Sequence, residues 1–375
     1  MLNGIYLSLM IGPTGTDPVP QSVVDALTSI QVTTSAGQRS GFQLSFTVGS
    51  GSPLNLTYLS TGYFDPATRV IITVTVNGTP TVLMDGVITQ QQLSPSNEPG
   101  QSTLTITGED LTRMMDIEDL TGKVDYKNMS DAAQVEKILA KYGQYGLISS
   151  VIPSVLDDTP NASQTTPQHE GTDWYYINQL ADKVGYVFYL EPGPAPGKNL
   201  AYWGPEVKLG QPQAALSVNM DAYSNVESLT FSYDGFSKTE FFVKVFDKDS
   251  TEPRQIPIPD ISSLNPPLGA KVPMPLRKEQ LYVSSEYGDA AITLIGMAKA
   301  ARSADIVSGS GQLDVIRYGR VLKARELVGV RGAGATYDGV NYVKSVTNNI
   351  KGGEYKQSFT LSRNALVSNT PALLV

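Results

Sequence analysis

Few residues in this sequence could carry acid–base or nucleophilic chemistry. The chain has one histidine, His169, and no cysteine. These counts exclude a cysteine nucleophile, a multi-histidine metal site, a zinc ribbon and an iron–sulfur centre. A Ser-His-Asp arrangement would have to use His169, which lies in the polar segment TTPQHEGTD. A loop histidine beside a glutamate is more often a solvated side chain than a general base, so we interpret His169 as non-catalytic.

The other chemical candidates are also weak. Asp157 and Asp158 are adjacent in a proline-flanked loop, whereas the carboxylate pair of a glycosidase spans about 5–10 Å between rigid elements. The glycine-rich run at 329–339 lacks both phosphate-loop patterns and precedes no helix pattern, so a hairpin is expected. Trp174 and Trp203 could stack on a sugar, but we place them in a helix core and a strand. We predict no enzyme activity, no cofactor and no metal site.

Length and composition indicate a β-rich protein of two or three domains. The chain has 375 residues, with Gly 34, Pro 24, 17% charged residues and a formal charge of −8. The acid excess argues against a dedicated nucleic-acid binder. No apolar run approaches the ~18 residues of a membrane helix, and the start lacks the basic region of a signal peptide. We therefore expect folding in the cytoplasm and no membrane insertion.

Alternating apolar residues predict a first β-barrel over residues 1–112. Residues 42–48 and 70–76 show the period of two that is typical of strands. Asn77-Gly78 separates the second run from the next apolar run at 82–88, which predicts a hairpin. A short strand around 104–106 would complete this domain.

The next segment, residues 113–205, has the pattern of an α+β insert. Ser130 can cap one helix, with its apolar face on residues 132–142, and Thr172 can cap a second helix that stops at Gly185. The strands YVFYL and NLAYW follow, separated by the loop PGPAPG.

The remainder returns to strands and predicts a second barrel. We expect residues 226–233 and 241–246 to pair through Asp234-Gly235. A proline-dense stretch at 253–275 is interpreted as a linker or as an arm on a neighbouring subunit. A helix around 291–301 and four strands, at 312–318, 325–331, 342–348 and 355–361, end the chain. The second barrel would thus begin at 206–250, be interrupted by a Pro-rich arm and helical insert at 251–308, and finish at 309–375. The fold class is mainly β, with two tube-like β-barrel domains per chain joined by α/β insert domains.

Charge divides along the same boundaries. Residues 1–110 hold two basic and seven acidic residues, whereas residues 295–375 hold eleven basic and five acidic ones. An acidic first barrel and a basic last barrel could attract each other between subunits, although two independently solvated surfaces would show the same counts. The candidate subunit-interface residues are Arg317, Arg320 and Lys323.

Three segments in this order resemble the late control protein D family. Residues 84–119 hold a strand ending Asp-Gly-Val-Ile, a polar loop and a strand running into Gly-Glu-Asp-Leu. Residues 172–193 form a helix pattern ending "LA…GY" that leads into a strand, and residues 339–366 read Y-V-x-S-V, a turn, and a strand closing on Leu-Ser-Arg-Asn. Together they cover nearly the whole chain. The family comprises the hub proteins of phage tails and contractile injection systems, and it is similar to the first part of type VI secretion spike proteins.

The resemblance implies a structural function. Three chains would form a ring of six barrels that adapts a sixfold tail tube to a threefold central spike. The implied partners are two further copies in a homotrimer, a separate spike protein, tube or tube-initiator proteins and baseplate wedge proteins, with DNA or an effector passing through the lumen. The acidic net charge would keep a polyanion from adhering there. Assembly would occur in the bacterial cytoplasm, followed by incorporation into a virion or injection particle.

Two alternatives belong to other classes. One is a secreted carbohydrate-binding or adhesin-like β-protein that stacks sugars on Trp203 and on surface tyrosines, although no signal peptide supports secretion. The other is a hydrolase that uses carboxylates at strand ends, for which no pair stands out.

Overall fold

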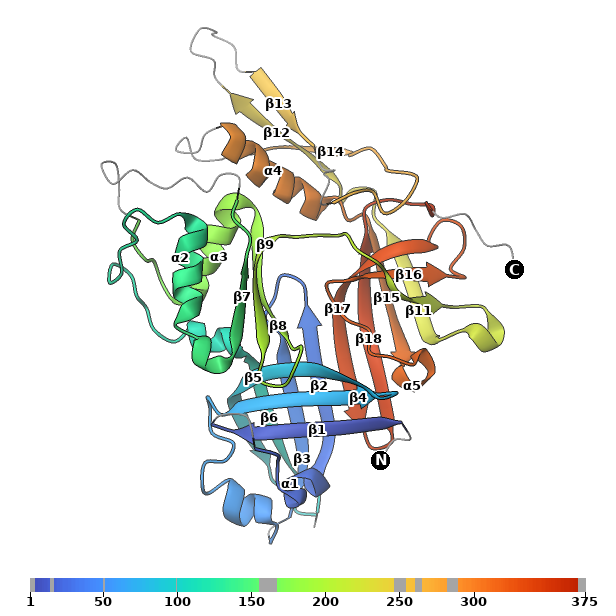
Figure 1. Cartoon of the computed structure of the whole chain (residues 1–375). Coiled ribbons are helices and arrows are strands. Elements are labelled where there is room, and N and C mark those ends of the chain that lie inside the picture. Colours follow the sequence, from blue (N-terminus) through green and yellow to red (C-terminus); the bar gives the residue numbers. More distant parts are fainter. Residues whose placement is uncertain are drawn as a thin grey trace.

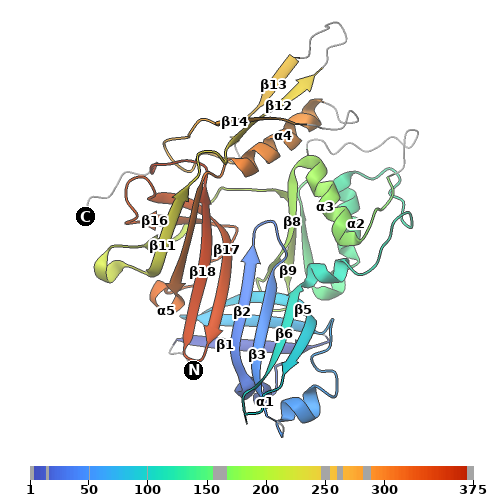
Figure 2. The same ribbon diagram turned by 180° about the vertical axis from the view of Figure 1, so that it is seen from behind.

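The structure is a computed structural model that describes residues 4–13, 17–49, 51–98, 100–154, 167–245, 254–259, 265–281 and 289–369. Two barrels lie side by side (Figure 1), one blue to cyan and the other mainly red. A green insert stands beside them, and a smaller orange insert lies above. The same arrangement is seen from behind in Figure 2. The expected fold class, mainly β with α+β inserts, is confirmed.

Six strands form the first barrel, in the spatial order β1-β4-β5-β6-β3-β2. The first half of β5 pairs with β4 and its second half with β6, so this long strand bends the sheet around the core. The predicted hairpin at Asn77-Gly78 is confirmed, because both residues have positive φ (49° and 80°) as a type I′ turn requires. The strand bounds are β1 Ile5–Gly12, β2 Leu27–Ser35, β3 Gly41–Val48, β4 Arg69–Val76, β5 Thr79–Ser94 and β6 Ser102–Asp110, with the short helices α1 Gln21–Ala26 and η1 Leu54–Tyr58.

The second barrel repeats this strand order, with one difference in direction: β10 pairs parallel with β16, whereas its counterpart β1 pairs antiparallel with β4. Its order is β10-β16-β17-β18-β15-β11, which matches the first barrel when each set of six is numbered along the chain. The bulges also match: one interrupts β2 between Leu27 and Ser29, and its counterpart interrupts β11 between Val226 and Ser228. The bounds are β10 Gln213–Ser217, β11 Val226–Tyr233, β15 Val307–Asp314, β16 Leu327–Arg331, β17 Gly339–Lys351 and β18 Glu354–Arg363, with α5 at Val315–Tyr318.

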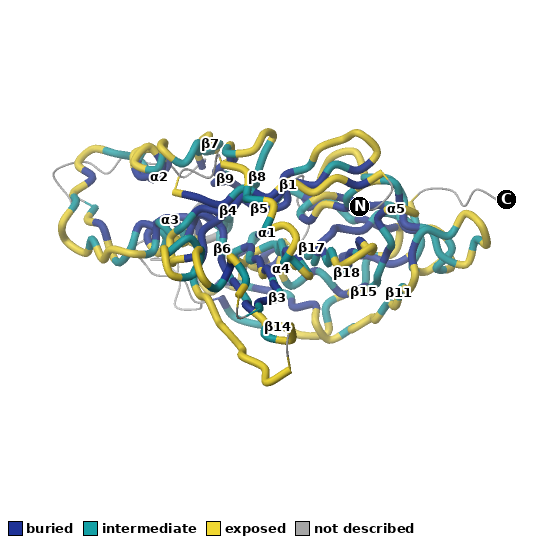
Figure 3. The backbone as a smooth tube through the Cα atoms, turned by 90° about the horizontal axis from the view of Figure 1, so that it is seen from below, coloured by how far each residue is buried: buried dark blue, intermediate teal, exposed yellow. Residues whose placement is uncertain are grey.

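A strand pair unites the two barrels. Residues Ser29–Ser35 of β2 pair antiparallel with Ser345–Lys351 of β17, so both barrels belong to one twelve-stranded sheet. One hydrophobic core runs through both barrels and includes Leu44, Phe46 and Phe359. In Figure 3 the buried segments run through the middle of the molecule, and exposed loops surround them. The chain therefore contains one complete example of a barrel–barrel contact.

The first insert has its own core between two helices and a three-stranded sheet. Ser130 and Thr172 cap α2 and α3 as predicted, and Gly185 ends α3 with a φ of 73°. Both helices pack on the sheet, whose strand order is β7-β9-β8. The bounds are η2 Leu111–Met115, α2 Asp131–Ala140, η3 Gly143–Tyr145, β7 Leu147–Val151, α3 Asp173–Val184, β8 Tyr186–Pro192 and β9 Asn199–Pro205.

The second insert corrects one predicted pairing. β11 does not pair with the next strand through Asp234-Gly235; it pairs with β15, and β12 pairs with β13 and β14 in a separate sheet. The turn there carries the chain out of the barrel instead of reversing it. The predicted strand at 312–318 is also partly wrong, because Asp314 caps the short helix α5. The bounds are β12 Thr239–Val245, β13 Arg254–Ile258, β14 Arg277–Gln280 and α4 Asp289–Ser303.

The described part of the proline-dense stretch lies on its own chain. Leu268 is buried, and its backbone N–H donates to the Asn364 side chain at 2.9 Å. The backbone of Lys271 forms an isolated antiparallel β-bridge with that of Leu366. These contacts favour an arm held by the end of the second barrel.

Candidate functional site

His169, the candidate general base, is sealed inside the first insert. Its side chain is fully buried, its Nδ1 lies 2.8 Å from the hydroxyl of Tyr126, and its ring packs against Tyr176. Its Nε2 lies 3.6 Å from Asp173, which also accepts from Lys141. The interpretation as a solvated loop residue is wrong. Burial lowers the pKa of His169, partly opposed by Asp173, and the ring contributes to the insert core.

The remaining chemical candidates are structural where they are described. Trp203 is completely buried in the insert core and Trp174 lies under the guanidinium of Arg39 at 4.4 Å. Trp203 therefore offers no stacking surface for a sugar. The glycine-rich run forms the predicted hairpin between β16 and β17. Asp157 and Asp158 lie outside the described residues. Among the described residues there is no cluster that could hold a metal ion and no helix long and apolar enough to cross a membrane.

A broad uncharged surface covers one face of the shared sheet. Eight strands, in the order β5-β6-β3-β2-β17-β18-β15-β11, turn one side chain in two away from the core. Hydroxyls bond across the joint, as Thr33 does to Thr347 at 3.0 Å. A concavity of about 340 Å³ on this face is lined by residues such as Thr230, Gln312 and Ser358. The uncharged face comprises Gln31, Thr33, Gln43, Ser45, Thr105, Thr107, Ser228, Thr230, Ser310, Gln312, Thr347, Asn349, Ser358 and Thr360.

The charged residues of these strands lie away from the centre of the face. Lys344 lies at the bulge of β17, where its carbonyl accepts from Ala36 beyond the end of β2. Glu109 lies near the end of β6, Asp314 ends β15, and Lys356 follows the turn into β18. Lys356 is paired with Glu227 at 2.9 Å. The centre of the face is therefore neutral, and the overall negative charge of the chain is located elsewhere.

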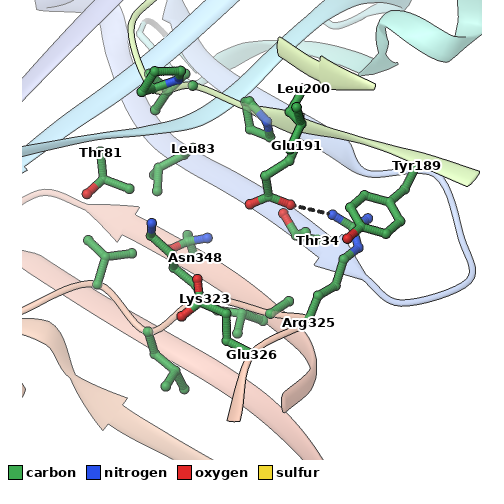
Figure 4. Close-up of a pocket in the computed structure, with 18 of the residues that line it drawn as sticks. Thr34, Thr81, Leu83, Tyr189, Glu191, Leu200, Lys323, Arg325, Glu326 and Asn348 are labelled. Atoms are coloured by element: carbon green, nitrogen blue, oxygen red, sulfur yellow. Dashed lines mark hydrogen bonds and ion pairs between the residues drawn. The ribbon is translucent and has the colours of Figure 1, made fainter. Parts of the chain in front are cut away.

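Arg325 belongs to the second barrel and contacts both the first barrel and the first insert. The sequence analysis did not single it out. It donates to Glu191 of β8 at 2.8 Å and to the carbonyl of Ser35 in β2 at 2.9 Å, and its guanidinium lies 4.2 Å from the ring centre of Tyr189. Figure 4 shows this group at the edge of a cavity of about 550 Å³ between both barrels and the insert. No sequence pattern marks Arg325, and its left-handed φ of 64° is seen only in the structure.

A second buried cluster ties the insert to the first barrel. Arg69 donates to both carboxylate oxygens of Asp85 at 2.8 Å and to the carbonyl of Tyr145 at 2.7 Å. Asn199 of the insert donates to the same carboxylate at 2.8 Å. Asp85 thus has a structural role within the Asp-Gly-Val-Ile segment.

The three candidate interface residues are all exposed. Lys323 lines the cavity beside Arg325. Gly319, between Arg317 and Arg320, accepts from the Asn77 side chain at 2.9 Å, so this segment lies beside the first barrel of its own chain. A role for the three residues between subunits stays a prediction.

Comparison with known proteins identifies the fold. No protein-family model and no curated protein matches the chain. Among solved structures, the tail protein of Neisseria meningitidis MC58 superposes with a TM-score of 0.62 at 14% identity, over 97% of this chain and 98% of that one. The 43 kDa tail protein of prophage MuSo2 from Shewanella oneidensis gives 0.64 at 13%, over 96% and 99%. The chain has the fold of phage tail proteins.

The tail-protein fold extends to secretion systems. The E. coli c3393 protein, a type VI secretion component described as similar to the T4 tail proteins gp27 and gp5, gives a TM-score of 0.52 at 12% identity, over 93% of this chain and 77% of that one. The fold that the sequence resemblance implied is therefore confirmed over nearly the whole chain.

Proposed function

We propose that this chain is a structural, non-enzymatic hub protein of a phage tail or contractile injection system. Three copies would form a pseudo-sixfold ring between a sixfold tail tube and a threefold central spike. The observation that carries the proposal is the pair of barrels with the same strand order, joined edge to edge in one chain. Such a chain presents two similar units per copy, so three copies present six units. The tail-protein fold supports this role.

The uncharged face would line the central channel of that ring. Nucleic acid adheres to protein mainly through lysine and arginine contacts to phosphate, and the centre of this face has neither. The sequence-based expectation that net acidity repels a polyanion stays a prediction, and a neutral hydroxyl and amide surface would in addition give DNA or an effector little to bind.

Partners and location follow from the same proposal. A separate spike protein would bind one end of the ring, tube or tube-initiator proteins the other end, and baseplate wedge proteins its periphery. Assembly in the bacterial cytoplasm would precede incorporation into the particle. The carbohydrate-binding alternative loses its main candidate, because Trp203 is buried.

The test is negative-stain imaging and native mass measurement of the protein, purified alone and co-expressed with its genomic neighbours. A ring of three chains with six lobes around a central hole is the expected result. Monomers under both conditions would contradict the proposal, and a glycan-binding screen would then test the alternative.

A further inference from the structure

The joint between the barrels has two unpaired counterparts at the ends of the eight-stranded face. In the joint, β2 of the first barrel pairs with β17 of the second. By chain order within each barrel, β2 corresponds to β11, and β17 corresponds to β5. Within the described residues β11 pairs only with β15, and residues 90–94 of β5 pair only with β6. The β2–β17 joint is thus formed inside the chain. The equivalent joint would pair β11 with residues 90–94 of β5, and in the described residues both of these edges are open.

Matching bulges establish the correspondence residue by residue. The bulge in β5 lies between Ile88 and Gln90, and that in β17 lies between Val343 and Ser345, so Gln90 corresponds to Ser345. The bulge in β2 lies between Leu27 and Ser29, and that in β11 lies between Val226 and Ser228. Ser29 therefore corresponds to Ser228. Counting from these points gives the counterparts of the joint: Gln92 for Thr347, Leu93 for Asn348, Phe231 for Val32 and Ser232 for Thr33.

We propose that β11 of one copy pairs antiparallel with residues 90–94 of β5 in the next copy, in the register of the internal joint. Thr33 lies opposite Thr347 within the chain, so Ser232 lies opposite Gln92 between chains. Val32 lies opposite Asn348, so Phe231 lies opposite Leu93. The partner is a second copy of this chain, and the inference rests on the ring proposed above.

Strand direction is consistent with this closure. Every neighbouring pair among the eight strands is antiparallel, from β5 through to β11. Because the number of strands is even, the first and last run in opposite directions, and copies placed side by side meet as antiparallel strands. The contact joins two different edges, so it can repeat beyond a dimer, and it closes into a ring of three when successive copies are related by a 120° rotation.

The chemistry of the two edges also favours a partner. Residues 90–94 are all exposed and uncharged, and the single charge on β11, Glu227, is already paired with Lys356. Natural edge strands that stay unpaired usually carry lysine, proline or inward charges. Leu93 is 45% exposed, whereas Val32 and Asn348 in the internal joint are 0% and 4% exposed. Pro95 follows directly and ends the ladder, because proline has no N–H to donate.

Engineered disulfides test the register, and the chain has no cysteine of its own to interfere. In a Gln92→Cys/Ser232→Cys double variant the two residues would be direct antiparallel partners, within the Cα separation that a disulfide needs. Oxidation of the assembled protein should shift most chains into disulfide-linked species on a non-reducing denaturing gel, with the closed trimer as the largest. Reduction should return them to monomer.

Two control variants bracket the result. Thr33→Cys/Thr347→Cys places the pair in the internal joint and should give a disulfide within one chain. Gln91→Cys/Ser232→Cys shifts the register by one residue, which turns the two side chains to opposite faces, and should give no linked species.

The outcomes distinguish failure of the proposed β11–β5 register from failure of the proposed ring. Rings without cross-linking in the Gln92/Ser232 variant, or preferential linking in the Gln91/Ser232 variant, would overturn the register and leave the hub function standing. Protein that stays monomeric by native mass, with the internal control disulfide formed, would overturn both.

Discussion

Buried polar residues connect the parts of this molecule that distant segments of the chain supply. Arg325 contacts β2, 290 positions earlier, and Arg69 contacts the insert through the carbonyl of Tyr145. Such groups add little stability over apolar packing, but removing one partner leaves a charge buried without compensation. Substitutions at these positions therefore report directly on the contacts between domains.

Asp85→Asn should be among the most destabilising single changes in the first barrel. The Asp85 side chain is completely buried and that of Arg69 is 7% exposed, so the variant leaves a buried guanidinium without its carboxylate. We expect the free energy of unfolding to fall by about 3 kcal/mol, measured by chemical denaturation. Glu98→Gln, at an exposed loop position, is the control and should be neutral. Equal stability of both variants would contradict the assignment.

His169→Gln should change how stability depends on pH. Burial holds the pKa of His169 below its usual value, so below about pH 6.5 the unfolded chain binds a proton that the folded chain does not. The free energy of unfolding of the natural protein should therefore fall as the pH drops from 7 to 5.5. The variant keeps a hydrogen-bonding partner for Tyr126 and should show a shallower fall. Parallel stability curves for the two proteins would refute the lowered pKa.

At the scale of elements, close strand crossings explain two glycines in the segment that resembles tail hubs. A Cβ on Gly86 would overlap the carbonyl oxygen of Glu109, and one on Gly108 would overlap the ring of Phe42. Both positions lie where β5 bends from one side of the barrel to the other beside β6. The bend allows β5 to pair with β4 along its first half and with β6 along its second half. In the second barrel, β17 pairs with β16 and β18 in the same way.

Gly86→Ala should destabilise the first barrel by about 1–3 kcal/mol, because backbone must move to make room. The matched control is Gly49→Ala, where an added Cβ meets nothing within 4 Å. Thermal unfolding followed by circular dichroism would measure both variants. A Gly86→Ala melting curve that superposes on the control would show that the crossing is looser than the structure indicates.

Positive charge on the uncharged face should create DNA binding that the natural protein lacks. Thr33→Lys with Thr347→Lys would put adjacent ammonium groups at the joint, repeated in every copy. We expect salt-dependent retention of short DNA in an electrophoretic mobility assay, strongest at low salt. Thr33→Gln with Thr347→Gln is the neutral control. Strong DNA binding by the natural protein would argue against an inert channel.

At the scale of the whole molecule, the acidic first barrel and the basic last barrel give each copy two unlike sides. Reversal of charge at Arg317, Arg320 and Lys323 together should weaken trimer formation, most strongly at low salt, where charges are least screened. Analytical ultracentrifugation at two salt concentrations would measure this effect. Reversal of the exposed Lys127 and Lys198 on the insert serves as the comparison. Unchanged assembly of the triple variant would show that charge attraction between the barrels does not stabilise the trimer.

The sequence by itself determined the local structure. Period-two alternation located most strands, Asn77-Gly78 predicted its hairpin, and Ser130 and Thr172 predicted their helix starts, because these signals act between residues close in the chain. The mainly β fold class and the resemblance to tail proteins followed from the order of such segments.

Only the tertiary structure decided which strands are neighbours and which residues hold the domains together. The turn signal at Asp234-Gly235 predicted a hairpin between β11 and the next strand, but β11 pairs with β15, which follows the whole second insert. β2 pairs with β17, which lies near the other end of the chain. His169 is buried between Tyr176 and Tyr126, which lies 43 positions earlier, and Arg325 contacts two other domains. The physical reason is common to all of them: burial and long-range pairing depend on the packing of the whole chain, which no short window of sequence contains.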